Sequence, residues 1–228
     1  MTRRLATLAL ALVAALSACS ADEPDENAAD KPARALLVAA LGDSITAGSP
    51  LWDPDEEVRA GIGEAVDPES QYEYWAQLAL GGQATFRNCG VFGERTDEIA
   101  ARLDRCSADA QVLIVQGGIN DIAQGRPVED AAESLRGMVQ AGKKRGLRVA
   151  LVDVLPWNNG YPRAAGPIDR LNRLIDGIGE DEDVPVYAFY DRLEDPRKPH
   201  RMKREWTIDG NHPSVKGYRR LAETVELP

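Results

Sequence analysis

Five short apolar runs recur along the chain and give the first indication of its fold. They cover residues 36–41, 84–91, 111–116, 148–155 and 184–190. The last three are rich in Val, Ile, Leu and Tyr, which favour extended structure. Most of their positions are apolar without alternation, and this predicts strands that are buried on both faces of a sheet.

Segments with helical periodicity lie between and after these runs. The helices are expected at residues 72–80, 96–105, 128–144, 168–178 and 214–225. Alternating strands and helices predict a parallel sheet, and right-handed crossovers place helices on both of its faces. The expected fold is therefore α/β, a three-layer sandwich with a five-stranded parallel sheet. Ligands of such sheets bind beyond the carboxyl ends of the strands, so the residues that follow each strand should be neighbours.

The first 34 residues have a different pattern from the rest. Arg3 and Arg4 precede an apolar stretch at residues 5–16 that is too short for a comfortable membrane span, as in a signal peptide. The following Leu-Ser-Ala-Cys resembles the lipobox of bacterial lipoproteins, which implies a signal peptide at residues 1–18 and lipidation of Cys19. A plain secretory signal with an incidental Cys is the alternative. Residues 20–34 are acidic and lack large apolar side chains, which predicts a disordered tether.

The remaining residues, 35–228, are expected to form one domain. On this reading the protein is exported and held by its lipid on the outer face of the bacterial cell membrane, and we expect it to be a monomer. The formal net charge is −10, and removal of Arg3 and Arg4 lowers it to about −12. Nucleic-acid binding requires clustered Lys and Arg, so nucleic acid is not an expected partner.

Three cysteines limit the chemistry of the exported domain. If Cys19 carries lipid, Cys89 and Cys106 remain as an even pair in an oxidising compartment, which favours a disulfide between them. Two buried free thiols are the alternative. Two cysteines without a nearby His do not indicate a metal site, and no cofactor is expected.

Polar residues follow several of the predicted strands. Gly42-Asp43-Ser44 follows the first strand, and the segment "NCGVFGERT" contains the end of the second. "GGIND" follows the third, and "DGNHPS" precedes the last helix. Each segment alone has a structural explanation as a turn or helix cap. A nucleophilic serine, however, needs a base and a group that orients the base, and the sheet edge can bring them together.

The chain has two histidines, and they differ in context. His200 lies in the charged segment "EDPRKPHRMKRE", where a solvated surface role is expected. Asp209 precedes His212 by three residues, which lets its carboxylate fold back onto Nδ1 and leaves Nε2 for the Ser44 proton. The backbone N–H of Gly93 and the side-chain amide of Asn120 can donate to an oxyanion.

With these residues in order, the chain resembles the SGNH hydrolases of the GDSL esterase/lipase superfamily. "GDSIT", "NCGVFGERT", "GIND" and "DGNH" match the four sequence blocks of that family. The resemblance implies a flavodoxin-like sandwich and a triad of Ser44, His212 and Asp209. It also implies an oxyanion hole formed by the Ser44 N–H, Gly93 and Asn120. An α/β-hydrolase is disfavoured because its Gly-x-Ser-x-Gly motif needs a Gly two residues after the serine, where this chain has Thr46.

The expected function is hydrolysis of a small-molecule, lipid or glycan ester through an acyl-enzyme. An acyltransferase acting on a cell-envelope sugar and a non-catalytic binding lipoprotein are the alternatives. The acidic segment at residues 49–71 is expected to line or cover the pocket. Trp52 and Trp157 flank the same edge, either as walls of the substrate site or as packing residues.

Overall fold

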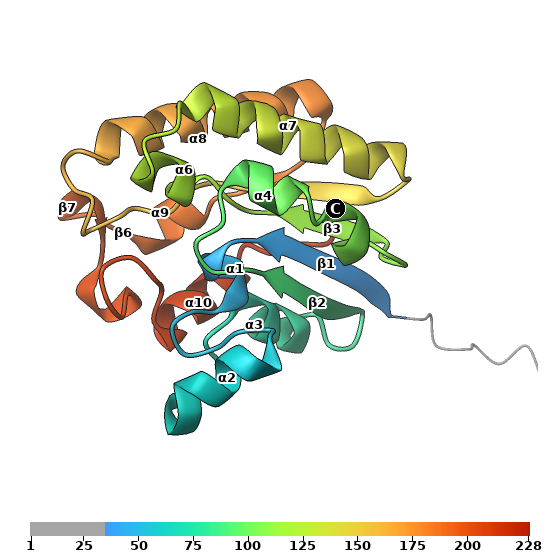
Figure 1. Ribbon diagram of the computed structural model, residues 1–228, viewed down its shortest axis with the longest axis horizontal. Coiled ribbons are helices and arrows are strands. Elements are labelled where there is room, and N and C mark those ends of the chain that lie inside the picture. Colours follow the sequence, from blue (N-terminus) through green and yellow to red (C-terminus); the bar gives the residue numbers. More distant parts are fainter. Residues whose placement is uncertain (1–34) are drawn as a thin grey trace, which may run out of the picture. The chain divides into compact units, whose positions relative to one another are not determined.

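A computed structural model describes residues 35–228, and its centre is a five-stranded sheet (Figure 1). The strands are β1 (Leu36–Gly42), β2 (Ala84–Gly90), β3 (Val112–Val115), β4 (Arg148–Val152) and β5 (Val186–Tyr187). Their order is β2-β1-β3-β4-β5, and every pairing is parallel. The three-layer α/β sandwich with a five-stranded parallel sheet is thus confirmed.

The absence of alternation in the strands is explained by two cores, one on each face of the sheet. In β1, Ala39 and Leu41 pack into one core, while Val38 and Ala40 pack into the other. Strands β3 and β4 divide in the same way, because successive side chains point to opposite faces. Both faces are therefore removed from water, which is the main source of stability for this layer.

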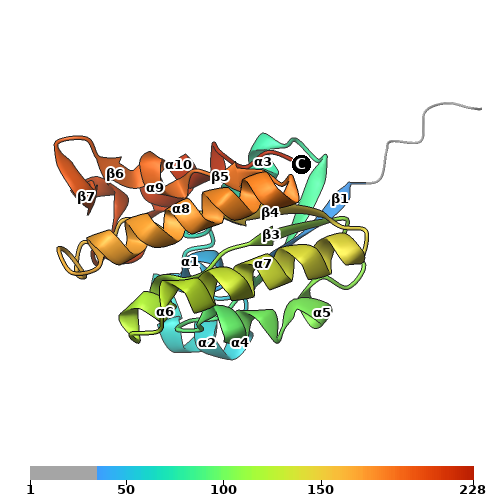
Figure 2. The same ribbon diagram turned by 90° about the horizontal axis from the view of Figure 1, so that it is seen from above.

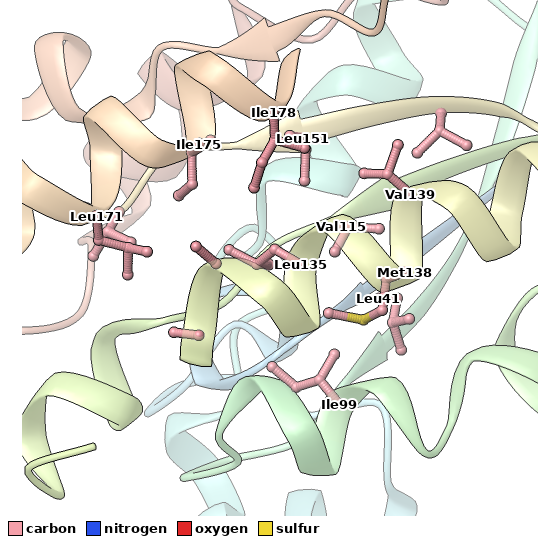
Figure 3. Packing of buried hydrophobic residues seen from close by; sticks show 14 of the residues in the cluster. Leu41, Ile99, Val115, Leu135, Met138, Val139, Leu151, Leu171, Ile175 and Ile178 are labelled. Atoms are coloured by element: carbon pink, nitrogen blue, oxygen red, sulfur yellow. The ribbon is translucent and has the colours of Figure 1, made fainter. Parts of the chain in front are cut away.

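Helices α4 (Thr96–Ala100), α5 (Leu103–Cys106), α7 (Val128–Lys144) and α8 (Ala165–Glu182) cover one face. Helix α7 shows why its sequence forms a helix here. Ala131, Leu135 and Met138 form a buried stripe at helical spacing, seen in part in Figure 3. Acidic residues occupy the first turn and lysines the last, which suits the helix dipole.

The opposite face is covered by α3 (Tyr72–Ala79), α9 (Phe189–Leu193) and α10 (Val215–Ala222). In Figure 1, α7 and α8 lie above the sheet and α3 and α10 lie below it, and the view from above in Figure 2 looks onto α7 and α8. Two short helices, α1 (Ser44–Ala47) and α6 (Ile119–Ala123), follow β1 and β3 directly. They begin at the carboxyl edge of the sheet, where the candidate residues were expected.

Several predicted elements have different bounds in the structure. The single helix expected at residues 96–105 is divided into α4 and α5, and the division falls at Arg102. The strand expected at 184–190 is reduced to β5, because Phe189 already begins α9. The Asp153 carboxylate accepts a hydrogen bond of 2.8 Å from the Tyr190 N–H in the first turn of α9. This side-chain contact could not be read from the apolar pattern.

The apolar pattern did not predict the antiparallel hairpin of β6 (Glu194–Asp195) and β7 (Lys198–Met202). The acidic segment at 49–71 contains helix α2 (Glu56–Ile62) and a 3₁₀ turn, Gly63–Ala65. None of the helices described in residues 35–228 is both long and apolar enough to cross a membrane. The predicted signal peptide, the lipidated Cys19 and the tether lie outside the described residues.

Candidate active site

Ser44 lies in the tight turn that joins β1 to α1. The Asp43 side chain caps the helix by accepting a hydrogen bond of 2.9 Å from the Ile45 N–H. A Cβ at Gly42 would collide with Thr46 and Gln116, and one at Gly90 would collide with the backbone of Ala47. These glycines let β2 and the side chains of α1 approach the turn closely. Ser44 is consequently only 3% exposed.

Asp43 is a fully buried carboxylic acid beside this serine. Burial raises its pKa to about 6, although hydrogen bonding to Ile45 and Gln116 and the charge of His212 act in the opposite direction. One of its oxygens, Oδ2, has no hydrogen-bond partner among the described residues. Its Oδ1 is used by the helix cap, so we assign Asp43 to positioning the turn.

A continuous chain of hydrogen bonds runs from Ser44 to Asp209. Ser44 Oγ lies 3.0 Å from His212 Nε2, and His212 Nδ1 lies 2.7 Å from Asp209 Oδ2. Ser44 and His212 are 168 residues apart in the sequence. The fold therefore brings together the nucleophile, base and orienting acid predicted from the sequence, with the distances required for proton transfer.

The loop between Thr207 and Pro213 holds the imidazole by contacts within itself. Asp209 Oδ1 accepts hydrogen bonds from the N–H groups of Asn211, at 2.8 Å, and His212, at 2.7 Å. Partial burial would raise the pKa of Asp209, but the bonds from the His212 ring and these N–H groups outweigh it and leave the pKa lowered. The carboxylate is thus held in the charged form that stabilises an imidazolium.

Thr207 is a residue of this loop that the sequence analysis missed. Its hydroxyl donates to the His212 carbonyl oxygen at 2.8 Å and accepts from the Gly210 N–H at 2.9 Å. The ring of Phe92 stacks on the imidazole with a centroid separation of 6.0 Å. Phe92 precedes Gly93 directly, so this contact brings the Gly93 segment beside His212.

Gly93 lies in the left-handed region, with φ of 81°, on the loop after β2. The Gly93 N–H has no hydrogen-bond acceptor among the described residues, and neither has the Ser44 N–H at the start of α1. Asn120 donates a hydrogen bond of 2.9 Å to the carbonyl oxygen of Glu94. Asn120 therefore packs against the Gly93 loop, and its second amide N–H is available to another acceptor.

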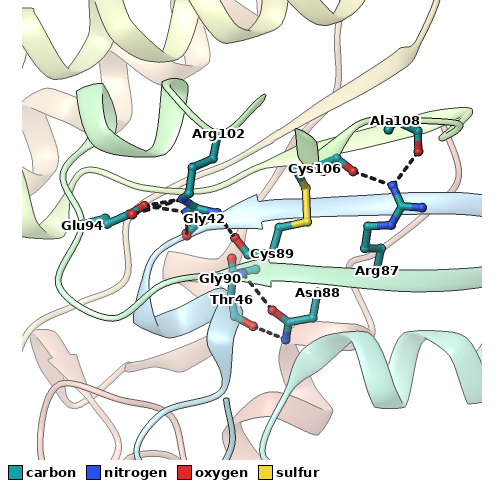
Figure 4. Close-up of a disulfide and its surroundings, with 10 residues drawn as sticks. All are labelled: Gly42, Thr46, Arg87, Asn88, Cys89, Gly90, Glu94, Arg102, Cys106 and Ala108. Atoms are coloured by element: carbon teal, nitrogen blue, oxygen red, sulfur yellow. Dashed lines mark hydrogen bonds and ion pairs between the residues drawn. A yellow bond between two sulfur atoms is a disulfide. The ribbon is translucent and has the colours of Figure 1, made fainter. Parts of the chain in front are cut away.

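The loop is held from its other side by a disulfide and an arginine (Figure 4). Cys89 and Cys106 form a disulfide with a Cα–Cα distance of 6.0 Å, which excludes the alternative of free thiols. Arg102 donates to the carbonyl oxygens of Cys89, at 2.7 Å, and Gly42, at 3.0 Å. Its guanidinium also makes a 2.6 Å ion pair with Glu94. It thereby ties the ends of β1 and β2 to the Gly93 loop.

The second acid of "GIND", Asp121, has a structural contact that the sequence analysis did not assign. It is fully buried and accepts hydrogen bonds from the Thr96 N–H and hydroxyl, at 3.0 and 2.8 Å. Arg126 neutralises it through a 2.7 Å ion pair. Asp121 thus joins α6 to the start of α4 and fixes the frame on which Asn120 stands.

Two hollows adjoin the site. A small cavity of about 10 Å³, enough for one water molecule, is lined by Ile45, Trp157 and Asn211 among others. A larger cleft of about 840 Å³ runs between the segment at residues 53–58 and the disulfide, with Phe92 on its wall. Residues 49–71 contribute Asp53, Pro54 and Val58 to this cleft, but its lining does not include Ser44 or His212, so their expected place over the candidate active site stays a prediction.

Trp52 and His200, two residues singled out in the sequence, lie outside the contacts described above. The ring of Trp52 lies under the Arg59 guanidinium at 4.8 Å, and we interpret it as a packing residue. The solvated surface role expected of His200 is met only in part, because its side chain is 37% exposed. His200 is half-buried in β7 with its Nδ1 2.9 Å from the Tyr190 hydroxyl. Among residues 35–228, no group of three His, Cys, Asp or Glu side chains is arranged to hold a metal ion.

Comparison with known proteins assigns the chain to a family. Residues 40–220 match the GDSL-like Lipase/Acylhydrolase family, and the protein belongs to it. Family membership supports a hydrolase with esterase or acylhydrolase activity. No curated protein sequence matches the chain.

Solved structures share the fold at low sequence identity. A protein assigned to the lipolytic G-D-S-L family from Desulfitobacterium hafniense is 19% identical, with a TM-score of 0.68 over 83% of this chain and 97% of that one. A G-D-S-L family member from Veillonella parvula is 17% identical, with a TM-score of 0.67 over 83% and 96%. An acetyl xylan esterase from Geobacillus stearothermophilus is 20% identical, with a TM-score of 0.63 over 83% and 92%.

Proposed function

We propose that the protein hydrolyses carboxylic esters through an acyl-enzyme on Ser44. The observation that carries this proposal is the chain of contacts from Ser44 Oγ to His212 Nε2 and from His212 Nδ1 to Asp209. Ser44 attacks the acyl carbonyl carbon while His212 takes its proton. His212 then gives that proton to the leaving alcohol, and Asp209 stabilises the imidazolium.

The oxyanion formed by this attack needs donors that are already in place. We assign this role to the N–H groups of Ser44 and Gly93 and to the Asn120 amide. The free state of the two backbone N–H groups supports the assignment, because a donor without an internal acceptor can bind the oxyanion without breaking another bond. A water molecule then attacks the acyl-enzyme with His212 as base, which frees Ser44.

The test is hydrolysis of p-nitrophenyl esters from acetyl to palmitoyl, together with an acetylated xylan oligosaccharide. The latter substrate is included because one structural neighbour is an acetyl xylan esterase. We expect turnover of at least one ester by the wild type and its loss in Ser44→Ala, with unchanged circular dichroism. Near-wild-type turnover by folded Ser44→Ala protein would refute the acyl-enzyme.

We further propose that the enzyme is exported and anchored by lipid at Cys19, and that it acts as a monomer. The support is the order of basic, apolar and small residues before Cys19. Cys19→Ser should release the domain from membranes, because none of the helices described in residues 35–228 could cross the membrane in place of the lipid. A processed variant that stays membrane-bound in high salt would contradict the anchor.

A further inference from the structure

A concentration of positive charge lies beside the candidate active site, in contrast to the formal charge of −10 for the whole chain. It surrounds a hollow of about 620 Å³. Five basic side chains line this hollow, namely Arg197, Lys198, Arg201, Lys203 and Arg204. Only two carboxylates, Asp195 and Glu205, share the lining, so the net charge there is +3.

The two carboxylates do not neutralise all five basic side chains of the hollow. Asp195 lies 3.6 Å from Arg197, and Glu205 lies 2.6 Å from Lys203. Lys198, Arg201 and Arg204 have no ion pair with any residue from 35 to 228. Lys198 and Arg204 are exposed, while the Arg201 guanidinium is positioned 4.4 Å over the ring of Tyr161. Three cations therefore remain available to an anion.

The hollow shares a wall with the loop that carries the proposed orienting acid. Thr207 and Gly210, which flank Asp209 in this loop, line the hollow. Asn159 donates a 2.7 Å hydrogen bond to the Asp209 carbonyl oxygen, and Asn158 holds both backbone groups of Met202 in β7. The β6–β7 hairpin lies at the end of the molecule toward which β1 points, as Figures 1 and 2 show.

We infer that this hollow, which we call the basic hollow, binds an anionic group carried by the ester substrate. Its volume suits part of a small molecule. Arginine and lysine side chains, together with the amides of Asn158 and Asn159, are suitable donors for a carboxylate or phosphate. The inference rests on the proposed esterase activity and adds the charge of the preferred substrate to it.

The test compares matched charged and neutral esters. One pair is 4-acetoxybenzoate and 4-acetoxybenzamide, which differ in charge on the leaving alcohol. The other is the p-nitrophenyl monoester of glutaric acid and that of glutaramic acid, which differ in charge on the acyl group. We expect the wild type to prefer the anionic member of one pair through a lower KM. The pair that shows the preference identifies the side of the ester facing the basic hollow.

The double variant Lys198→Gln with Arg204→Gln should reduce that preference about tenfold or more, since hydrogen bonds to charged groups contribute substantially to binding. High salt should weaken the wild-type preference in the same direction. Lys144→Gln with Arg173→Gln removes two exposed cations elsewhere and is the matched control. The control should keep the wild-type ratio of kcat/KM between the anionic and the neutral ester.

The two proposals fail in distinguishable ways. Hydrolysis of both members of each pair at equal kcat/KM would overturn the basic hollow and leave the esterase standing. If no ester is hydrolysed, the binding of 4-acetoxybenzoate and 4-acetoxybenzamide to Ser44→Ala is compared by calorimetry. Tighter binding of the anionic benzoate supports the basic hollow, and equal binding overturns it. A double variant that loses binding to anionic phospholipid vesicles but keeps the ester preference would assign the cations to a membrane surface and overturn the inference.

Discussion

The two ends of the proposed triad are built in different ways. Ser44 is 3% exposed and lies in a turn enclosed by β1, β2 and the buried face of α1. The Asp209 side chain is 43% exposed, and its position depends on hydrogen bonds within residues 207–213. The core therefore fixes the proposed nucleophile, Ser44, whereas a short loop fixes the proposed base, His212. Substitutions around Ser44 should affect folding first, and those in the loop should affect chemistry first.

The largest expected effect is on the loop side. Asp209→Asn can keep accepting the two backbone N–H groups but no longer holds the charge and tautomer of His212. We expect kcat to fall about 10⁴-fold, as for loss of the orienting acid in other triads, with little change in melting temperature. Asp191→Asn, an exposed acid on α9, is the control. A small loss of kcat would show that His212 is oriented by other groups.

The fold and the proximity of Ser44, His212 and Asp209 could be predicted from the sequence because their signals are short sequence patterns. Continuous apolar strands indicated a buried sheet, and four short motifs indicated the residues at its edge. Arg102 and Asp121 were missed because they contact residues distant in the sequence, and Thr207 was missed because its contacts with Gly210 and His212 depend on the conformation of their loop. Arg102, for example, donates to the Gly42 carbonyl 60 residues away. The segment around His200 was expected to be solvated because it is rich in charged residues. Its sequence does not reveal the β6–β7 hairpin, which Asn158 holds through the backbone of Met202.

Removal of the disulfide tests whether the Gly93 loop is held by the core, as Ser44 is, or by local contacts, as Asp209 is. Cys106→Ser should lower the free energy of unfolding by about 2–5 kcal/mol, the usual cost of removing a native bridge. Turnover should fall less, because Arg102 still ties Cys89 and Gly42 to Glu94. Urea denaturation and ester turnover measure the two effects. If the fall in kcat, expressed as a free energy, exceeds the loss of stability, the disulfide rather than Arg102 mainly fixes the position of the Gly93 loop.

Gly90 and Gly93 allow the enclosed turn around Ser44 to be compared with the open loop after β2. Gly90→Ala would drive a methyl group into the Ala47 backbone, so we expect overpacking to cost about 1–3 kcal/mol of stability. Gly93→Ala meets no atom within 4 Å and should suffer only the strain of its positive φ, about 1–2 kcal/mol. Gly90→Ala should therefore be the less stable variant, and equal stability of the two in urea denaturation would remove the distinction between an enclosed turn and an open loop.

The last expected effect concerns the pH dependence of stability and Glu73, a buried acid on α3. Neither carboxylate oxygen has a partner among the described residues, and burial raises its pKa well above 4.5. The folded protein therefore keeps a proton that the unfolded chain releases, so stability should fall as the pH rises above about 4.5. Glu73→Gln should flatten this slope by up to about 1.4 kcal/mol per pH unit. Parallel profiles for the two proteins would show that Glu73 ionises normally.

The central claim, that Ser44 is an activated nucleophile, is tested most directly by covalent labelling. A fluorophosphonate should modify the wild-type protein at one site, and peptide mass spectrometry should locate the adduct on Ser44. Asp209→Asn should be labelled much more slowly, and Ser44→Ala should not be labelled at all. An adduct on another residue, or equal labelling of wild type and Ser44→Ala, would contradict the account.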